Sequence, residues 1–392
     1  MVLSLGAGSV MAQKPGDIPR RPRLPDGADS NSAASYRSLA LQKLQSDPDK
    51  AADALYWATR LEPTTAEFIW GYRAALLLAD RQMALDYLTD DPGIRHRPQA
   101  RLLDSLNNRA RMLDPFLRPW LDDVVITELV KDEARRSVRQ AQGEEFSESE
   151  LDFEVRAYLS GTDSPLSPYL EFARGHLAQA IGGWQNRERR EPRNAGIHIE
   201  LARAFATAGL LDSARNEMTN GLELLRTSDT TTMRLFYNSK ASLEYFIGRV
   251  DERRGQPDSA RAAYERALVE DLSYYPAHVQ LGRLAYMRGD TAANLQELAR
   301  AVDVKGDDYV CRLVYGSALA AAHQLDSAVV HLRRAIDLEP WAARPRIILA
   351  VVLENQGNHA AATESYRAFA ERAARNDPML PTARARSQTP SP

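Results

Sequence analysis

The side chains best suited to acid–base, nucleophilic or metal chemistry in this sequence are its histidines, its single cysteine and a few adjacent carboxylates. The histidines are His96, His176, His198, His278, His323, His331 and His359. None of them forms a His-Glu-x-x-His metal motif, and we find no phosphate-binding loop, no G-x-S-x-G nucleophile elbow and no G-x-G-x-x-G dinucleotide motif. The pairs Asp122-Asp123 and Asp307-Asp308 are adjacent in sequence and are expected to be solvated. The sequence therefore supports no enzyme reaction and no catalytic residue.

The cysteine count and the charge balance narrow the classes of partner and cofactor. Cys311 has no second cysteine, so an intrachain disulfide and a metal site built on paired cysteines are both excluded. A net charge of −3 gives no electrostatic drive towards nucleic acid or anionic lipid. Beyond the N-terminal stretch there is no apolar run of 18 residues, so the sequence predicts no transmembrane segment. We expect no cofactor, no metal and no nucleic-acid partner.

The N-terminal stretch MVLSLGAGSVMAQ suggests export. It is apolar, and Val10-Met11-Ala12 fits the small-residue cleavage pattern of a secretory signal, although no Lys or Arg precedes Lys14. We interpret residues 1–12 as the remnant of a signal peptide whose true start codon lies upstream of Met1. This predicts a periplasmic or secreted protein, and the alternative is an apolar tail on a cytoplasmic one.

A spacing of 34 residues runs through the second half of the chain. Small residues recur at this interval at Gly248, Gly282, Gly316 and Ala350. A turn column follows at Gly255, Gly289, His323 and Gly357, and a later column reads Ala267, Ala301, Ala335 and Phe369. A fixed period in this range indicates a solenoid of stacked repeats. The length of 392 residues is too great for one simple core and suits two domains or an extended repeat array.

Each repeat contains two helices separated by a turn. The stretches AYERAL (263–268) and HLRRAIDL (331–338) carry apolar residues at i, i+3 and i+4 on charged helices. The stretches ATRLEP (58–63) and AIDLEP (335–340) share the pattern Ala-x-x-Leu-Glu-Pro, in which the proline ends the second helix. Gly or Ala where two helices cross lets their axes approach, and neighbouring pairs must stack because one pair buries too little surface alone.

On these columns the chain resembles the tetratricopeptide repeat family. The matching residues are the small column of the first helix, the turn glycines, the alanines that open the second helix (Ala260, Ala328, Ala362) and the later alanine column. Departures are Asn294, His323 and Phe369, and the first-helix tryptophan is missing. The resemblance implies an all-α fold in which 34-residue helix–turn–helix repeats stack as a right-handed superhelical solenoid.

The register divides the chain into segments. The array is expected over residues 166–378, with the best repeats starting near 195, 241, 275, 309 and 343. The other segments are a disordered linker (13–32), degenerate repeat-like helices (33–92), an irregular helical region (93–165) and a disordered tail (379–392). Within the irregular region, DPFLRPWLDD (114–123) is a proline-punctuated turn with two large aromatic residues.

The resemblance also implies a partner-binding groove lined by the first helices at positions five, nine, twelve and thirteen of each unit. The groove residues are Arg203, Tyr245, Arg249, Glu252, Arg253, Arg283, Tyr286, Met287, Leu313, Ile347 and Asn355. Arg203, Arg249 and Arg283 share the ninth position and would form a ladder of guanidinium forks able to hold carboxylates. We therefore expect the groove to take an acidic or C-terminal segment at one end and an apolar segment at the other.

A plainer alternative is that the charged column is an ordinary solvated face. Arg249 could pair with Glu252 one turn on, and Arg203 with Glu200 one turn back. Exposed pairs of this kind contribute only about 0.3–0.5 kcal/mol.

The function predicted from the sequence is a non-catalytic scaffold or adaptor of the bacterial cell envelope that binds a protein or peptide. Two alternatives stay open. One is an accessory module of an envelope enzyme complex, with residues 93–165 holding a partner or substrate. The other is a cytoplasmic assembly factor or chaperone-like cofactor.

Overall fold

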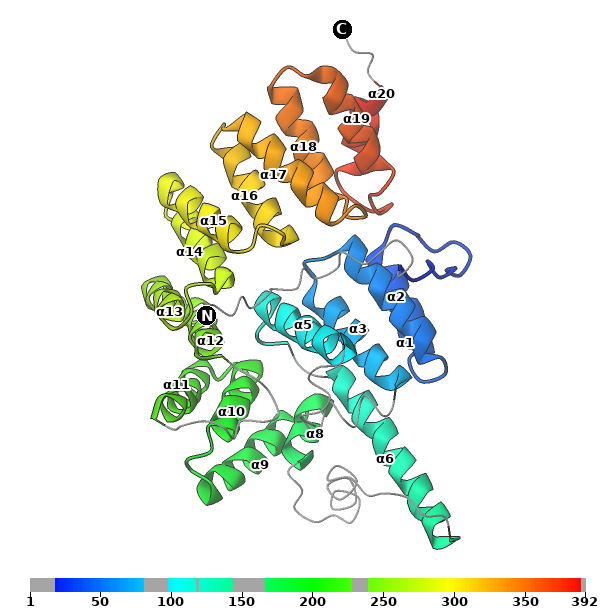
Figure 1. The fold of residues 1–392 in the computed structure, drawn as a ribbon, viewed down its shortest axis with the longest axis vertical. Helices are drawn as coiled ribbons and strands as arrows, with labels where there is room; N and C mark the ends of the chain where they lie inside the picture. Colours follow the sequence, from blue (N-terminus) through cyan, green and yellow to red (C-terminus); the bar gives the residue numbers. More distant parts are fainter. Residues whose placement is uncertain (1–17, 81–97, 118–119, 144–165, 228–238, 389–392) are drawn as a thin grey trace, which may run out of the picture. The chain divides into compact units, whose positions relative to one another are not determined.

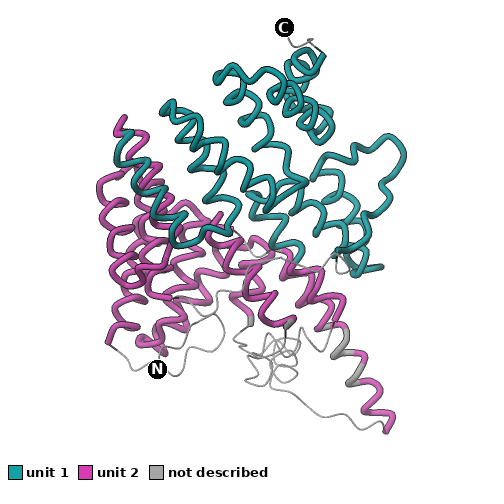
Figure 2. The backbone as a smooth tube through the Cα atoms, turned by 45° about the horizontal axis from the view of Figure 1, so that its top comes forward, with its two compact units in different colours: residues 1–72, 291–392 teal, residues 73–290 magenta. Residues whose placement is uncertain are grey.

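A computed structural model describes residues 18–80, 98–117, 120–143, 166–227 and 239–388. Every regular element in these ranges is an α-helix, which confirms the predicted all-α class (Figure 1). The chain forms two compact units, residues 1–72 with 291–392 (unit 1) and residues 73–290 (unit 2) (Figure 2). Predictions for the signal-peptide remnant and for parts of the 33–92 and 93–165 segments lie outside the described residues.

Unit 2 contains the irregular region and the first half of the array. Its helices are α5 (Pro98–Leu113), α6 (Trp120–Ala141), α8 (Leu166–Arg174), α9 (Leu177–Arg190), α10 (Ala195–Thr207), α11 (Leu211–Thr227), α12 (Lys240–Arg253), α13 (Pro257–Glu270) and α14 (Tyr275–Met287). Antiparallel hairpins pair α8 with α9, α10 with α11 and α12 with α13, and each hairpin packs on the next. A helix α3 (Ala66–Ala79) runs across the boundary between the units.

Unit 1 combines both ends of the chain. Its helices are α1 (Ala33–Lys43), α2 (Pro48–Leu61), the start of α3, α15 (Thr291–Val304), α16 (Tyr309–Ala321), α17 (Leu325–Leu338), α18 (Arg344–Asn355), α19 (His359–Ala370) and α20 (Leu380–Gln388). Hairpins pair α1 with α2, α16 with α17 and α18 with α19. First helices in the two units therefore begin at residues 195, 240, 275, 309 and 344, next to the repeat starts read from the sequence.

The small and turn columns have the packing roles that their spacing predicted. Gly248 lies against the ring of Tyr264, so a methyl group at Gly248 would overlap that ring. At the turn column, Gly255 and Gly357 adopt φ of +70° and +75°, and His323 takes the same left-handed conformation with φ of +58°. The turn therefore requires a left-handed backbone conformation, which His323 adopts although it is not a glycine.

Residues 18–32 pack on the helices of unit 1, to which they belong. This corrects the prediction of a disordered linker at 13–32 for this part of the segment. The Arg21 guanidinium lies 5.0 Å from the ring centroid of Trp57, and Arg21 Nε donates to the hydroxyl of Tyr36 at 2.7 Å. Asn31 Nδ2 donates to the carbonyl of Glu371 at 2.7 Å. Cation–π and backbone contacts, which leave no hydrophobic period in a sequence, hold this segment on the α1–α2 hairpin and on the C-terminal repeats.

The tail prediction is also corrected. Residues 380–388 form α20, and its Leu380 and Ala383 are buried in the same core cluster as Phe369 and Tyr366. Two apolar residues one turn apart are enough to seat this helix on α19, although the surrounding Pro, Arg and Ser residues favoured disorder by composition.

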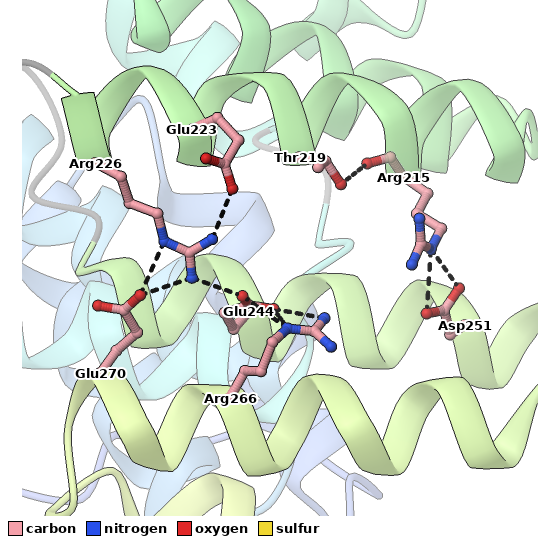
Figure 3. A network of polar contacts seen from close by, with 8 residues as sticks. All are labelled: Arg215, Thr219, Glu223, Arg226, Glu244, Asp251, Arg266 and Glu270. Carbon is pink, nitrogen blue, oxygen red and sulfur yellow. Dashed lines mark hydrogen bonds and ion pairs between the residues drawn. The ribbon is translucent and has the colours of Figure 1, made fainter.

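A polar network joins the three successive helices α11, α12 and α13 of unit 2 (Figure 3). Arg226 pairs with Glu244 at 2.9 Å and with Glu270 at 2.7 Å. Glu244 is buried and also accepts two 3.0 Å hydrogen bonds from Arg266 Nε. Because a buried carboxylate requires compensation, these arginines fix how α12 packs between its neighbours.

Within the described ranges, none of the helices combines the length and the hydrophobicity that a membrane span requires.

Candidate partner-binding faces

The arginine column of unit 2 is compensated by carboxylates of the same unit. Arg203 pairs with Glu200 on α10. The Nε of Arg249 lies 3.8 Å from Glu252 Oε2, and Arg283 from α14 reaches the same Glu252. The ion pairs Arg203–Glu200 and Arg249–Glu252, which the plainer alternative named, are therefore both present. Glu252 also pairs with Arg283 of the next repeat.

Tyr245 is buried at the centre of the α12 face and contacts a segment from outside the array. Its hydroxyl donates to the backbone carbonyl of Met112 at 2.9 Å and accepts a hydrogen bond from Arg249 Nη1 at 3.2 Å. Burial raises the pKa of Tyr245, against the opposing effect of the Arg249 charge, so the hydroxyl remains a donor at neutral pH. The predicted groove residue is thus engaged by the end of α5.

The turn that follows α5 supplies an aromatic anchor for the same face. Phe116 is buried in the core cluster of the α10–α13 repeats, and its ring centroid lies 5.3 Å from that of Phe246. The Arg253 guanidinium also lies over the Phe116 ring, with its Cζ 3.5 Å from the ring centroid. Arg253, a predicted groove residue, is therefore in contact with the segment that precedes the array.

A cavity of about 230 Å³ remains between this segment and the first helices. The α5 side contributes Asn108, Arg111, Met112 and Pro115, and the opposite wall includes Arg203, Leu243, Tyr245 and Tyr274. Burial, together with the like charge of Arg203, lowers the pKa of Arg111 to about 10. The contact is anchored at Phe116 and Met112 but is incompletely filled between them.

The α14 end of unit 2 exposes side chains of the predicted groove. Tyr286 and Met287 are 66% and 67% exposed, and Arg283 keeps a half-exposed guanidinium that contacts Met287 Sδ at 3.1 Å. Large apolar side chains this accessible supply adaptable contact area for a partner.

Unit 1 carries an apolar cleft of about 400 Å³ on its first helices. It is lined by Ala320 and Ala321 of α16, by Ile347, Ile348, Val351, Val352 and Asn355 of α18, and by Met379. The sequence predicted Ile347 and Asn355 in the groove, and the structure places both in this cleft. Leu313 is a correction, because it is buried in the unit 1 core and does not line the cleft.

Comparison with known proteins agrees with this arrangement of helical hairpins. A family profile described as tetratricopeptide repeat matches residues 247–309, the stretch that holds the best-spaced columns. The chain therefore contains tetratricopeptide repeats in this stretch. Among curated proteins, none matches it.

Several solved tetratricopeptide repeat structures are similar over about half of the chain. YrrB, whose structure is described as a TPR protein with an unusual peptide-binding site, is 20% identical and covers 53% of this chain and 99% of its own, with a TM-score of 0.41. The C-terminal part of a TPR repeat-containing protein from Cytophaga hutchinsonii is 15% identical and covers 52% and 77%, with a TM-score of 0.43. MamA from Desulfovibrio magneticus RS-1 is 15% identical and covers 46% and 94%, with a TM-score of 0.38.

One group of side chains in the part of the chain that the structure describes has the donor types of a metal site. Donor atoms of Glu188, His198 and Glu217, from α9, α10 and α11, lie within 4.8 Å of one another. His198 Nδ1 is 2.7 Å from Glu217, and Nε2 is 3.1 Å from the carbonyl of Pro192. Burial lowers the pKa of His198, but the hydrogen bonds to Glu217 and Pro192 and the nearby carboxylates outweigh it and raise the pKa. An imidazolium bridging two carboxylates accounts for this group, so we assign it a structural role.

Sequence reasoning missed the partners of the first-helix faces. Phe116 and Met112 lie outside the 34-residue register, and the signal that could have found Phe116 was the aromatic, proline-punctuated turn DPFLRPWLDD. Met379 lies in the segment expected to be disordered, so its place in the unit 1 cleft had no signal in the repeat pattern.

Proposed function

We propose that this tetratricopeptide repeat protein is a non-catalytic protein–protein interaction scaffold or adaptor whose first-helix faces bind a peptide or partner helix. The observation that carries the proposal is the cleft of unit 1, where Val351 is 40% exposed beside Ile347 and Ile348. The cleft lies on α16 and α18, and a partner would cover apolar surface that now faces solvent.

The size of the cleft sets the kind of ligand. A volume of about 400 Å³ accepts a few side chains, as expected for an amphipathic helix or an apolar peptide segment. Burying one aliphatic side chain contributes about 1.5–3 kcal/mol, whereas micromolar affinity requires about 8 kcal/mol. Several anchors are therefore needed, and Asn355 at the rim supplies hydrogen bonds that orient the ligand.

We also propose that the protein acts in the cell envelope. The support is the apolar N-terminal stretch with its small-residue pattern at Val10-Met11-Ala12. N-terminal sequencing of the protein recovered by osmotic shock should begin at Gln13. Recovery only from the cytoplasmic fraction, with Met1 retained, would overturn this part of the proposal.

A charge placed on the first-helix face tests the scaffold function. Val351→Lys introduces an ammonium group into the cleft, and Val330→Lys introduces the same group on α17, where Val330 is 61% exposed. Proteins enriched by the tagged wild-type chain should fall at least tenfold with Val351→Lys and stay unchanged with Val330→Lys. Equal enrichment by all three proteins would contradict the proposal.

A further inference from the structure

The first-helix face of unit 2 already holds a polypeptide ligand supplied by the chain itself. Residues 98–117, which comprise α5 and the turn after it, precede the array and contact α12 through both backbone and side chains. This contact uses Tyr245 and Arg253, two positions expected to face a partner in the groove.

Two anchors of different chemistry fix the segment. The Met112 carbonyl accepts the hydrogen bond of the Tyr245 hydroxyl, and the Phe116 ring is held between Phe246 and the Arg253 guanidinium. Asp114 shapes the turn that joins them, because its carboxylate accepts the backbone N–H of Phe116 at 2.9 Å. An acid two residues before an aromatic ring therefore presents both anchors at once.

A partly open pocket of about 230 Å³ lies between the anchors, beside Arg111 and Arg203. These two arginines carry like charges on opposite walls of the cavity, and burial lowers the pKa of Arg111. The contact of the segment with α12 is thus anchored at Met112 and Phe116, and accessible space remains between these two anchors.

We propose that residues 98–117 are an intramolecular ligand of the α10–α12 face, and that this face binds a partner segment with the same acid–x–aromatic turn when the internal segment leaves. The proposal rests on the scaffold function and specifies its partner. The external segment carries an Asp or Glu, one intervening residue and a Phe. Its aromatic ring replaces Phe116 on Phe246 and Arg253, and its backbone carbonyl replaces that of Met112 at Tyr245.

Tethering makes the internal segment a strong competitor. A ligand in the same chain as its site competes intramolecularly, so an external peptide binds the wild-type chain weakly. Weakening the internal anchor removes this competition while leaving the receptor residues in place. Phe116 is the residue to change, since it belongs to the ligand and not to the repeats.

Fluorescence anisotropy with a labelled synthetic peptide of residues 98–117 provides the test. The full-length chain with Phe116→Ala should bind the peptide at least about tenfold more tightly than the wild-type chain. A peptide in which Phe116 is replaced by Ala should not bind, and adding Arg253→Gln to the Phe116→Ala protein should weaken binding about threefold or more. Equal peptide affinity of the wild-type and Phe116→Ala proteins, both folded by circular dichroism, would overturn the proposal.

Hydrogen exchange of the wild-type chain keeps the test decisive if Phe116→Ala fails to fold. A millimolar excess of the unlabelled peptide should raise amide exchange in α5, because the internal segment is displaced. Unchanged exchange in α5 at this excess would overturn the proposal. Either negative result leaves the Val351-dependent enrichment untouched, so failure here is distinguishable from failure of the scaffold function.

Discussion

Arg60 and Glu339 form a buried ion pair between the ends of two second helices, with Arg60 Nη1 2.9 Å from Glu339 Oε2. They lie in the two stretches that share the pattern Ala-x-x-Leu-Glu-Pro, ATRLEP at the end of α2 and AIDLEP at the end of α17. Trp57 and Trp341 pack edge to face beside them at 4.9 Å between ring centroids. The two ends of the chain are therefore joined within unit 1 where the second helices of two repeat-like hairpins end.

Removing one member of this pair should cost more than removing both. The side chains of Arg60 and Glu339 are only 11% and 6% exposed, so Arg60→Met leaves a carboxylate in a poorly solvated site and should destabilise unit 1 by about 3–5 kcal/mol. The double variant Arg60→Met/Glu339→Leu should recover most of that loss. Urea unfolding followed by tryptophan fluorescence measures both. A double variant as unstable as the single one would contradict the assignment of a coupled pair.

Adding one methyl group should have opposite effects at two helical glycines. Gly248→Ala forces a methyl group into the Tyr264 ring and should destabilise the protein by about 1–3 kcal/mol. Gly182→Ala is the matched control, because no atom lies within 4 Å of the added methyl group, and it should stabilise α9 by about 0.5–1 kcal/mol. Thermal unfolding compares the two. Equal effects of the same sign would show that close helix approach at Gly248 is not required.

Two glutamates that share the same arginine partner should differ in their contribution to stability. Glu244 is buried between Arg226 and Arg266, so Glu244→Gln should cost about 2–4 kcal/mol and the loss should persist at high salt. Glu223 pairs with Arg226 at the surface, and Glu223→Gln should cost less than about 0.5 kcal/mol. Denaturation in low and high salt distinguishes them, and a salt-sensitive loss at Glu244 would place that carboxylate in solvent.

The contribution of His198 to stability should be largest in mild acid. Because its folded-state pKa is raised above 6.5, the imidazolium contacts with Glu217 and Glu188 stabilise the fold fully below pH 6.5 and are lost as pH rises through the folded-state pKa. The destabilisation caused by His198→Gln should therefore shrink from pH 5.5 to pH 8.5. NMR titration gives an independent check, with His331 shifted in the opposite direction since burial and Arg312 lower its pKa.

The repeat units were predictable because their requirements are local and periodic. Close helix crossing at Gly248 and left-handed backbone at Gly255 restrict residue type at fixed positions, and each leaves a 34-residue signal. The contact of Phe116 with Phe246 joins residues far apart in sequence and has no period. For the candidate site, Ile347 and Asn355 followed from the register.

The charge pairing and the ends of the chain were less predictable, for physical reasons. The sequence showed that Arg249 could pair with Glu252 one turn away, but the sharing of Glu252 with Arg283 depends on the distance between two stacked repeats. The order of α20 rests on the burial of Leu380 and Ala383 and on the ion pair of Arg386 with Glu354. Residues 18–32 are held by Arg21 against aromatic rings and by a hydrogen bond of Asn31. The amino-acid composition of a segment does not reveal such single contacts, so it predicted disorder for both ends of the chain.

Site-specific photo-crosslinking in living cells tests most directly whether the first-helix faces are the surfaces that meet other proteins. A photoreactive phenylalanine analogue would replace Val351 on α18 or, as the control, Val330 on α17, and both valines are exposed in unit 1. The account predicts a discrete crosslinked partner from position 351 and none from position 330. Crosslinks from position 330 alone, or from neither position, would contradict it.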